Sequence, residues 1–347
     1  MTRSFAVTDV EVFDGVSFHP HQTIVIEDGL ISALGQAGET PLPSGMEVIG
    51  GEGHTILPGF IDCHVHIELH DPVKVLQGGV TTVRDLGWPA KRIFPLAERL
   101  AEDVSAGPRL LAAGPMLTAP GGYPTQAGWA PRGTGVEIES EEGARETVSL
   151  LSSAGASVIK VAQEPRQGPV MDEGLLSAVV DAAHSAGLKV TSHLGSLEQL
   201  EVALETGVDE LAHGLWSDEK IPADILDRMI VQDMVVVPTL HIDPTELRVD
   251  NLRRFLAAGG RVIYGTDMGN SGPPPGIDIT ELELMRRAGM SLTEVLIAST
   301  SAAAAYLGLA DRGEIRPGAR ADLVLVEGDL RNGLSPLSGP LLSRRGA

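Results

Sequence analysis

The chain contains 347 residues with a net charge of −21, and its isoelectric point lies near 4.8. Nucleic acids and anionic membrane surfaces require clustered Lys and Arg, so this acidic composition excludes them as expected partners. The chain contains no run of about 18 apolar residues, which is the length needed to cross a bilayer, and its start lacks the apolar core of a signal peptide. We therefore expect a globular, cytoplasmic protein.

The first part of the chain is predicted to form short β-strands separated by turns. The predicted strands span residues 5–12, 22–27, 30–33 and 46–49. Asp28-Gly29 is a typical hairpin turn, and a strand-like pattern returns near the other end, at 321–329. A small β unit with open edges is marginal by itself, so we expect the two ends of the chain to join in one domain.

Between the two ends, apolar strands alternate with helical segments, such as the helix that begins with the capping box Ser196 to Gln199. Eight strands in about 255 residues is the spacing of a (β/α)8 barrel. The eight predicted strands lie near 60–66, 81–86, 109–113, 157–161, 189–193, 210–213, 235–239 and 261–266.

The predicted fold is therefore α/β, a (β/α)8 TIM barrel with a small β-sandwich domain formed by the N- and C-terminal segments. Residues 58–312 form the barrel, and residues 1–57 and 313–335 form the composite β-sandwich. Residues 336–347 are expected to be a C-terminal tail. The single cysteine, Cys63, cannot form an intramolecular disulfide and is predicted to be a small buried hydrophobe.

His64 and His66 end the first predicted barrel strand. Alternate side chains of a strand face the same way, so the pair directs two imidazoles at one point, where they could bind a metal ion. Two histidines alone are equally compatible with core side chains whose ring nitrogens form hydrogen bonds to the backbone. Catalytic groups of a barrel come from the carboxyl ends of its strands, which raises the significance of further ligands there. The four further candidates at or just beyond strand ends are Lys160, His193, His213 and Asp267.

These residues and their surrounding motifs resemble the amidohydrolase superfamily, and within it the imidazolonepropionase-like and Xaa-Pro dipeptidase-like metal-dependent hydrolases. The resemblance covers nearly the whole chain. It begins with Leu-Pro-Gly-Phe-Ile-Asp-Cys-His-Val-His at 57–66 and ends with Arg-Gly-Glu-Ile-Arg-Pro-Gly-Ala-Arg-Ala-Asp-Leu-Val at 312–324. The motifs between them lie at 79–87, 159–161, 192–193, 210–214, 238–240 and 265–267.

The resemblance implies two divalent metal ions at this face of the barrel. His64 and His66 would bind the more buried ion together with Asp267, and His193 and His213 would bind the more exposed one. Imidazole and carboxylate ligands suit Zn²⁺, and they do not exclude manganese, iron, cobalt or nickel.

Lys160 resembles the lysine that carbon dioxide converts to a carbamate bridging the two ions. Its neighbours Val158, Ile159 and Val161 predict a strand buried on both faces, where an unmodified ammonium ion would be costly beside metal ions. A lysine that extends to solvent at a strand end is the alternative interpretation.

The resemblance also implies the reaction. A metal-bridging hydroxide would cleave a C–N bond in an amide, dipeptide, N-acyl amino acid or cyclic amide, and Asp267 would carry the proton to the leaving amine. Alternatives are a mononuclear deaminase of the same fold, in which Lys160 is an ordinary side chain, and a lyase or decarboxylase on the same scaffold. A further alternative, outside the enzymes, is a binding module on a barrel that has lost its catalytic activity.

The expected partner is a small-molecule substrate, and the resemblance also implies a homo-oligomer. Tyr123 stands where related sequences tend to have His, so the substrate pocket is altered. The segment 118–135, rich in Gly and Pro, is either a mobile lid or a rigid rim loop. The candidate substrate residues are Tyr123, Gln163, Trp216, His241 and Asn270, with Trp88 and Trp129 as further aromatic candidates in the rim loops.

Overall fold

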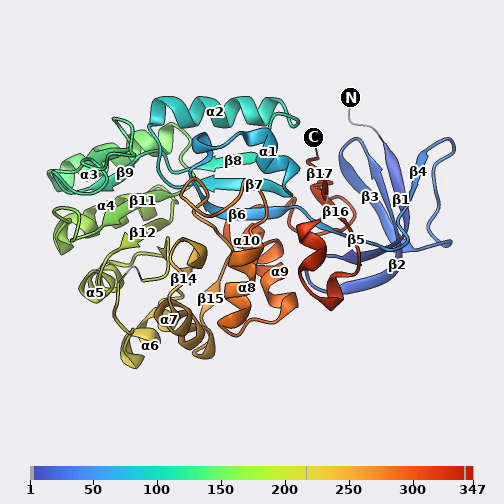
Figure 1. Cartoon of the computed structure of the whole chain (residues 1–347). Coiled ribbons are helices and arrows are strands. Elements are labelled where there is room, and N and C mark those ends of the chain that lie inside the picture. The colour runs from blue at the N-terminus through green and yellow to red at the C-terminus, as the bar shows by residue number, and fades with distance from the viewer. Residues whose placement is uncertain (1–3, 216, 340, 347) are drawn as a thin grey trace.

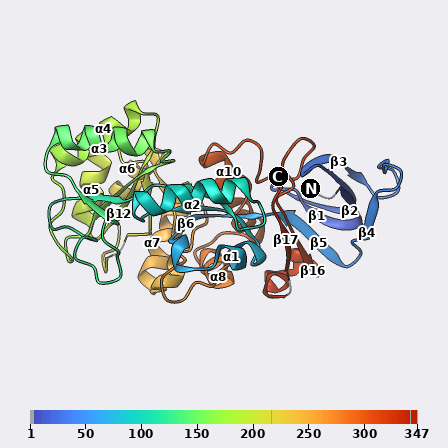
Figure 2. The same ribbon diagram turned by 90° about the horizontal axis from the view of Figure 1, so that it is seen from above.

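The computed structural model describes residues 4–215, 217–339 and 341–346. It has two parts of different architecture (Figure 1). One is an α/β body in which helices surround parallel strands, and the other is a β domain built from both ends of the chain. Seen from above, the molecule is elongated, with the β domain at one end (Figure 2).

Both ends of the chain contribute strands to the β domain, as the sequence predicts. Its strands are β1 (Phe5–Phe13), β2 (Phe18–Glu27), β3 (Leu30–Gln36), β4 (Glu47–Gly50), β5 (His54–Pro58), β16 (Leu323–Glu327) and β17 (Leu341–Arg344). β16 pairs antiparallel with β5, so Leu325 lies opposite Ile56. The predicted hairpin turn is confirmed, because Asp28 and Gly29 have positive φ angles of 49° and 81°, as such turns need.

The β domain is one mixed sheet with the order β17-β16-β5-β1-β2-β3, in which β4 pairs with β1. β17 lies within the range that was expected to be a tail, and it pairs antiparallel with β16. The sequence does not indicate this strand because its residues, Leu-Leu-Ser-Arg, do not alternate between apolar and polar. The inner face of the sheet is apolar, with buried residues such as Val10, Ile24, Ile56 and Leu323.

The α/β body has a strand at each of the eight predicted positions. These strands are β6 (Phe60–Val65), β7 (Val80–Asp85), β8 (Arg109–Ala112), β11 (Ile159–Gln163), β12 (Val190–Leu194), β13 (Glu210–Leu211), β14 (Val235–Val236) and β15 (Arg261–Val262). Two further strands of three residues each, which the sequence does not indicate, are β9 (Met116–Thr118) and β10 (Gly135–Glu137).

The ladders of the body form two parallel sheets. One contains β6, β7 and β8, and the other has the order β10-β9-β11-β12-β13-β14-β15. Single backbone hydrogen bonds run between the two. The amide of Cys63 donates to the carbonyl of Tyr264 at 3.0 Å, and the amide of Asp267 donates to the carbonyl of His64 at 2.8 Å. β6 therefore lies beside the segment that follows β15.

Helices follow most of these strands. They are η1 (Ile67–Leu69), α1 (Pro72–Gln77), α2 (Ala90–Glu102), α3 (Glu141–Ser153), α4 (Glu173–Ser185), α5 (Leu197–Thr206), α6 (Ala223–Val231), η2 (Leu240–Ile242), α7 (Glu246–Ala257), α8 (Ile279–Arg287), α9 (Leu292–Ala298), α10 (Ser301–Tyr306), η3 (Leu330–Asn332) and η4 (Ser335–Ser338). The predicted start of α5 is confirmed, since the Ser196 side chain accepts a hydrogen bond from the amide of Gln199. Within the described residues, no helix has both the length and the apolar character that a membrane crossing needs.

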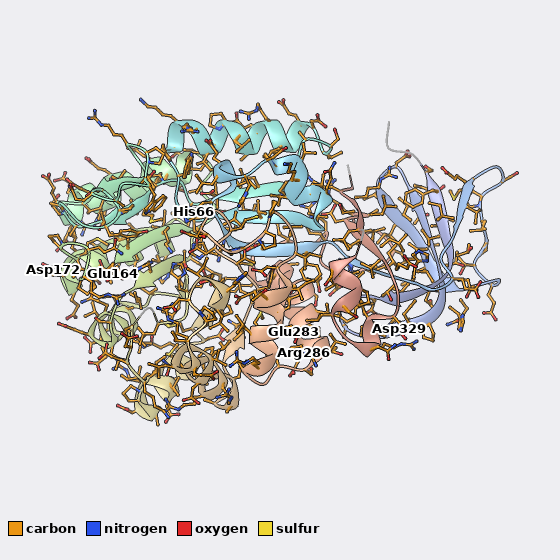
Figure 3. All side chains as sticks on the ribbon, viewed as in Figure 1. His66, Glu164, Asp172, Glu283, Arg286 and Asp329 are labelled. Carbon is orange, nitrogen blue, oxygen red and sulfur yellow. The ribbon has the colours of Figure 1, made fainter. Side chains whose placement is uncertain are left out.

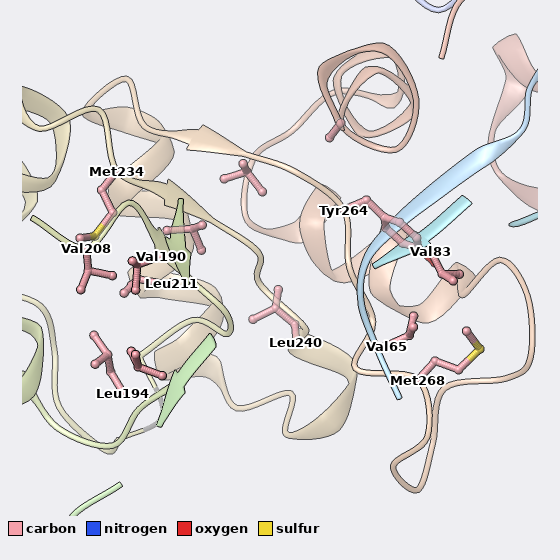
Figure 4. Packing of buried hydrophobic residues seen from close by; sticks show 14 of the residues in the cluster. Val65, Val83, Val190, Leu194, Val208, Leu211, Met234, Leu240, Tyr264 and Met268 are labelled. Atoms are coloured by element: carbon pink, nitrogen blue, oxygen red, sulfur yellow. The ribbon is translucent and has the colours of Figure 1, made fainter. Parts of the chain in front are cut away.

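The core of the body lies between the strands and their helices. Val190 and Leu211 from neighbouring strands belong to it, and so does Tyr264 (Figure 4). Every residue of β6 is buried, including Cys63, as predicted for a strand with packing on both faces. This packing fixes the strand that carries His64 and leads directly into His66.

Candidate metal centre

Asp267 lies among three imidazoles at the carboxyl ends of the strands. Its Oδ1 is 3.4 Å from Nε2 of His64 and 3.3 Å from Nε2 of His66, and its Oδ2 is 3.8 Å from Nδ1 of His213. The ligand atoms of His64, His213 and Asp267 all lie within 4.8 Å of one another. The fold thus joins residues that begin the α/β body to one that follows its last strand.

His193 extends this group on the side of β12. Its ring centroid is 4.9 Å from that of His213, which in turn is 4.5 Å from that of His64. All three rings are buried. The five predicted ligands other than Lys160 therefore form one continuous cluster.

Lys160 lies deeper in the body than the histidines. The sequence predicts Lys160 near the end of its strand, but β11 continues to Gln163, so Lys160 is the second residue of the strand. It lies opposite Thr191, whereas His193 lies opposite Ala162, so Lys160 is one step below His193 on the same face. Its side chain is buried, and burial lowers its pKa to about 7. A large fraction of the amine is therefore neutral near neutral pH.

Burial sets the charge of the candidate ligands. It holds the pKa values of His64 and His213 well below the usual range, so both rings are neutral and carry a lone pair. The pKa of His66 is raised, because burial lowers it but the adjacent Asp267 carboxylate, 3.3 Å away, outweighs that effect. Burial also opposes ionisation of Asp267, but His64 and His66 outweigh it, and the pKa of this carboxyl is lowered. A neutral imidazole beside a carboxylate is the form that binds metal.

Each imidazole has a partner that fixes the orientation of its ring. The pairs are His64 Nδ1 with the carbonyl of Ala212, His66 Nδ1 with that of Gly87, His213 Nδ1 with Oγ1 of Thr239, and His193 Nε2 with Oε2 of Glu164. A carbonyl can only accept, so it holds the proton on Nδ1 and leaves Nε2 as the ligand nitrogen in His64 and His66.

Two buried polar atoms of the cluster support a cation at this place. Oδ1 of Asp267 and Nζ of Lys160 have no hydrogen-bond partner among the described residues. Buried polar atoms are nearly always bonded, so each of these needs an explanation. A divalent cation would supply a partner for the carboxylate oxygen, and imidazole with carboxylate is a suitable donor set for one. The residues present therefore fit a metal ion.

The backbone around Asp267 is specialised for close approach. Asp267 and Thr239 have positive φ angles of 56° and 44°, which non-glycine residues adopt rarely. A Cβ at Gly265 would lie 2.4 Å from the side chain of Val237 and 3.0 Å from the backbone nitrogen of His64. Only glycine lets this segment lie so close to β6.

The predicted substrate residues have different surroundings. The Tyr123 ring packs 5.4 Å from that of His193, and Trp129 packs 5.4 Å from His66. Gln163 is fully buried. Its Nε2 donates to the carbonyl of Met171, and its Oε1 accepts from the amide of the same residue. The other three candidates are Asn270, which donates to the carbonyl of Asp267, His241, which bonds to Asp278, and Trp216, which lies outside the described residues.

Two features of the site were not predicted from the sequence. One is the contact of Glu164 with His193. The position of this carboxylate directly after a strand end is a sequence feature that could have indicated the contact. Arg84 and Glu210 form a buried ion pair of 2.6 Å on the strands below the site. Glu210 lies opposite Thr191, which lies opposite Lys160, so the pair is at the depth of the lysine.

Comparison with known proteins agrees with this geometry. A sequence profile of the Amidohydrolase family matches residues 55–339. The chain is 27% identical over 338 residues to an enamidase of Eubacterium barkeri, covering 88% of this chain and 81% of the enamidase. It is 24% identical over 358 residues to an imidazolonepropionase of Salinispora tropica, with 92% and 90% covered.

The fold has a counterpart among solved structures. A Xaa-Pro dipeptidase with methionine bound in its active site superimposes with a TM-score of 0.84 and 23% identity, covering 98% of this chain and all of that one. This likeness concerns the fold, whereas the profile match spans most of the sequence and includes all six candidate ligands. The chain therefore belongs to the amidohydrolase family, whose members are metal-dependent hydrolases that act on carbon–nitrogen bonds.

Proposed function

We propose that the protein is a binuclear hydrolase that cleaves a C–N bond in a small amide, dipeptide-like, N-acyl or cyclic amide substrate. The observation that carries the proposal is the convergence of three buried imidazoles on Asp267, with His193 beside His213 and Lys160 below them. The six residues come from five separate strand units, because His64 and His66 share β6 and the residue after it, and so many buried polar groups at one place are unusual for a core.

In this proposal, His64, His66 and Asp267 would hold the more buried ion, and His193 and His213 would hold the more exposed one. Lys160 would serve as a further ligand in the form of a carbamate, which its neutral amine and carbon dioxide form with release of a proton. The pKa near 7 supports this role, because only the neutral amine reacts. When bound, two Zn²⁺ ions would act as Lewis acids that polarise the substrate carbonyl and lower the pKa of water.

The residues of the chain then have separate tasks. Asp267, ionised and with Oδ1 close to two imidazoles, accepts a proton from the attacking water and passes it to the leaving amine. Tyr123 and Trp129, whose rings are 6.3 Å apart, cover the cluster on its open side and exclude water. Flat apolar groups next to the scissile bond would pack favourably against these rings.

The proposed fold is a closed (β/α)8 barrel over residues 58–312, with a composite β domain from residues 1–57 and 313–335 that forms one mixed sheet in place of the expected β-sandwich. Bonds from β6 to the segment after β15 support closure, and β17 supports extending the β domain into residues 336–347. We also propose a cytoplasmic enzyme that forms a homo-oligomer and has a small-molecule substrate.

A mononuclear deaminase is the second candidate. One observation favours it, namely that His64, His213 and Asp267 by themselves bring three ligand atoms within 4.8 Å. In that case Lys160 would remain an ordinary amine.

Metal stoichiometry and the Lys160→Ala variant separate the two functions. The native protein and the variant are loaded with Zn²⁺ and bicarbonate, analysed for metal, and assayed with dipeptides, N-acyl amino acids and cyclic amides. The hydrolase predicts two ions per native chain and loss of turnover in Lys160→Ala. One ion per chain, with no hydrolysis of these substrates and with ammonia released from an amino-heterocycle by both proteins, would favour the deaminase instead.

A further inference from the structure

Glu164 is a buried carboxylate beside the metal cluster, directly after β11 (Figure 3). Its side chain has no exposed surface, and its Oε2 accepts a hydrogen bond of 3.2 Å from Nε2 of His193. Burial alone would raise the pKa of Glu164, but bonds from His193 and Arg166 lower it to about 2.

Arg166 holds this carboxylate in one orientation. Its Nε donates to Oε1 at 2.9 Å, its Nη2 donates to Oε2 at 3.0 Å, and its backbone amide donates to Oε1 at 3.1 Å. Together with the bond from His193, each oxygen accepts two hydrogen bonds. An ionised carboxylate has about four acceptor sites, so Glu164 is fully occupied. It is thus unsuited to binding a metal ion itself.

The chain leaves room for this arrangement at Gly195. A Cβ at that position would lie 2.5 Å from Oε1 of Glu164, so any larger residue would displace the carboxylate. The ring of His193 is further bounded by Tyr123, at 5.4 Å, and by His213, at 4.9 Å. Of the three neighbours Glu164, Tyr123 and His213, Glu164 forms a hydrogen bond to a ring nitrogen of His193.

That contact decides which nitrogen of His193 carries the proton. A carboxylate held by the Arg166 guanidinium and backbone amide acts as an acceptor, so the Nε2 that faces it bears hydrogen in the neutral ring. The lone pair is then on Nδ1. The opposite tautomer would place a lone pair against the carboxylate and a proton on the nitrogen needed for a metal.

We propose that Glu164 is the positioning residue of His193, holding its ring in the Nε2–H tautomer so that Nδ1 binds the more exposed metal ion. This inference rests on the proposed function, in which His193 is a ligand of that ion. Arg166 and Gly195 serve the same purpose indirectly, by fixing the carboxylate and by leaving space for it.

The test compares Zn²⁺ affinity in the native protein and in Glu164→Gln. The amide of glutamine offers one acceptor oxygen where the carboxylate offers two, so either His193 or Arg166 loses its partner. Loss of such an outer-shell carboxylate lowers metal affinity by about 10–100-fold. We expect that loss for one ion and native affinity for the other, measured by competition with a chromophoric chelator.

Asp243→Asn is the matched control. Asp243 pairs with Arg248 at 3.0 Å in the segment after β14, and it has no bond to any of the six ligands among the described residues. We expect this variant to bind both ions as the native protein does. Native affinity for both ions in Glu164→Gln would overturn the inference.

A second measurement reads the tautomer directly, without metal. The ¹⁵N chemical shifts of the His193 ring in the metal-free full chain should indicate Nε2–H in the native protein and an increased Nδ1–H population in Glu164→Gln. An identical tautomer in both proteins would contradict the inference. If the native protein bound only one ion, the proposed binuclear function would fail, and this measurement would still decide the role of Glu164.

Gly195→Ala keeps the test decisive if Glu164→Gln does not fold. The added Cβ displaces the carboxylate while every charge remains, so the same selective loss of affinity for one ion is expected. Native affinity for both ions in this variant would count against the inference.

Discussion

Nη2 of Arg84 donates a hydrogen bond of 2.6 Å to Oε1 of Glu210, and both side chains are 1% exposed. Nε of Arg84 also donates to the carbonyl of Cys63, and Oγ1 of Thr191 donates to the same oxygen of Glu210. The pair therefore ties β6, β7, β12 and β13 together below the metal cluster. It is a structural ion pair of the interior that also sets the electrostatic surroundings of Lys160.

Arg84→Met should destabilise the protein strongly. Glu210 would remain buried without its charged partner, which typically costs about 3–5 kcal/mol. Urea unfolding of the metal-free protein measures the loss. Arg145→Met, which removes an exposed pair with Glu141, serves as the control and should change the free energy of unfolding by less than about 1 kcal/mol. A loss below about 1 kcal/mol in Arg84→Met would show that the pair adds little.

Asp267→Asn should abolish most of the turnover. The amide cannot accept the proton that the carboxylate accepts, and such acid–base groups contribute about 10²–10⁴-fold to rate. Steady-state kinetics and metal analysis check the prediction, and Asp243→Asn should retain native turnover. Near-normal turnover with both ions bound in Asp267→Asn would remove Asp267 from the mechanism.

Glu281→Gln should remove a pH dependence of stability. Burial raises the pKa of Glu281 from 4.5 to about 8, although its Oε2 accepts a bond of 2.7 Å from the amide of His241. Because the folded-state pKa exceeds the unfolded one, its contribution is fully present below pH 4.5 and is lost as pH rises to about 8. At about 1.4 kcal/mol per pKa unit, this loss amounts to several kcal/mol.

The measurement is the free energy of unfolding of the native protein and Glu281→Gln between pH 5 and pH 9, by urea titration at about one-unit steps. The free energy of unfolding of Glu281→Gln should increase relative to that of the native protein as pH rises. Glu283→Gln is the control, since Glu283 lies on the same helix, α8, but is half exposed beside Arg286 (Figure 3). A difference that stays constant with pH for Glu281→Gln would refute the raised pKa.

Trp129→Ala should weaken substrate binding more than catalysis. If Trp129 covers the substrate, losing one aromatic contact of about 0.5–1.5 kcal/mol raises KM by about 2–10-fold for amides that carry a flat apolar group. Trp129→Phe should restore much of the binding. Equal KM values for apolar and polar substrates in Trp129→Ala would assign Trp129 to loop anchoring alone.

Local patterns were sufficient to predict much of the fold. Apolar runs and their spacing placed all eight strands of the α/β body, because strand burial and helix amphipathicity leave a period in the sequence. The hairpin at Asp28-Gly29 and the cap at Ser196 were predicted for the same reason. β9, β10 and β17 were not, since their residues show no clear alternation of apolar and polar side chains and their pairing joins segments outside the regular strand-helix spacing.

The sequence alone also determined which residues could hold metal, because parallel strands bring their carboxyl ends to one edge and His64, His193, His213 and Asp267 each lie there. Only the tertiary structure decided how these side chains are oriented and what lies behind them. The contact of Glu164 with His193, the Arg84–Glu210 pair and the depth of Lys160 depend on strand register and loop path. These are set by packing between segments far apart in the chain, which leaves no periodic trace in the sequence around each residue.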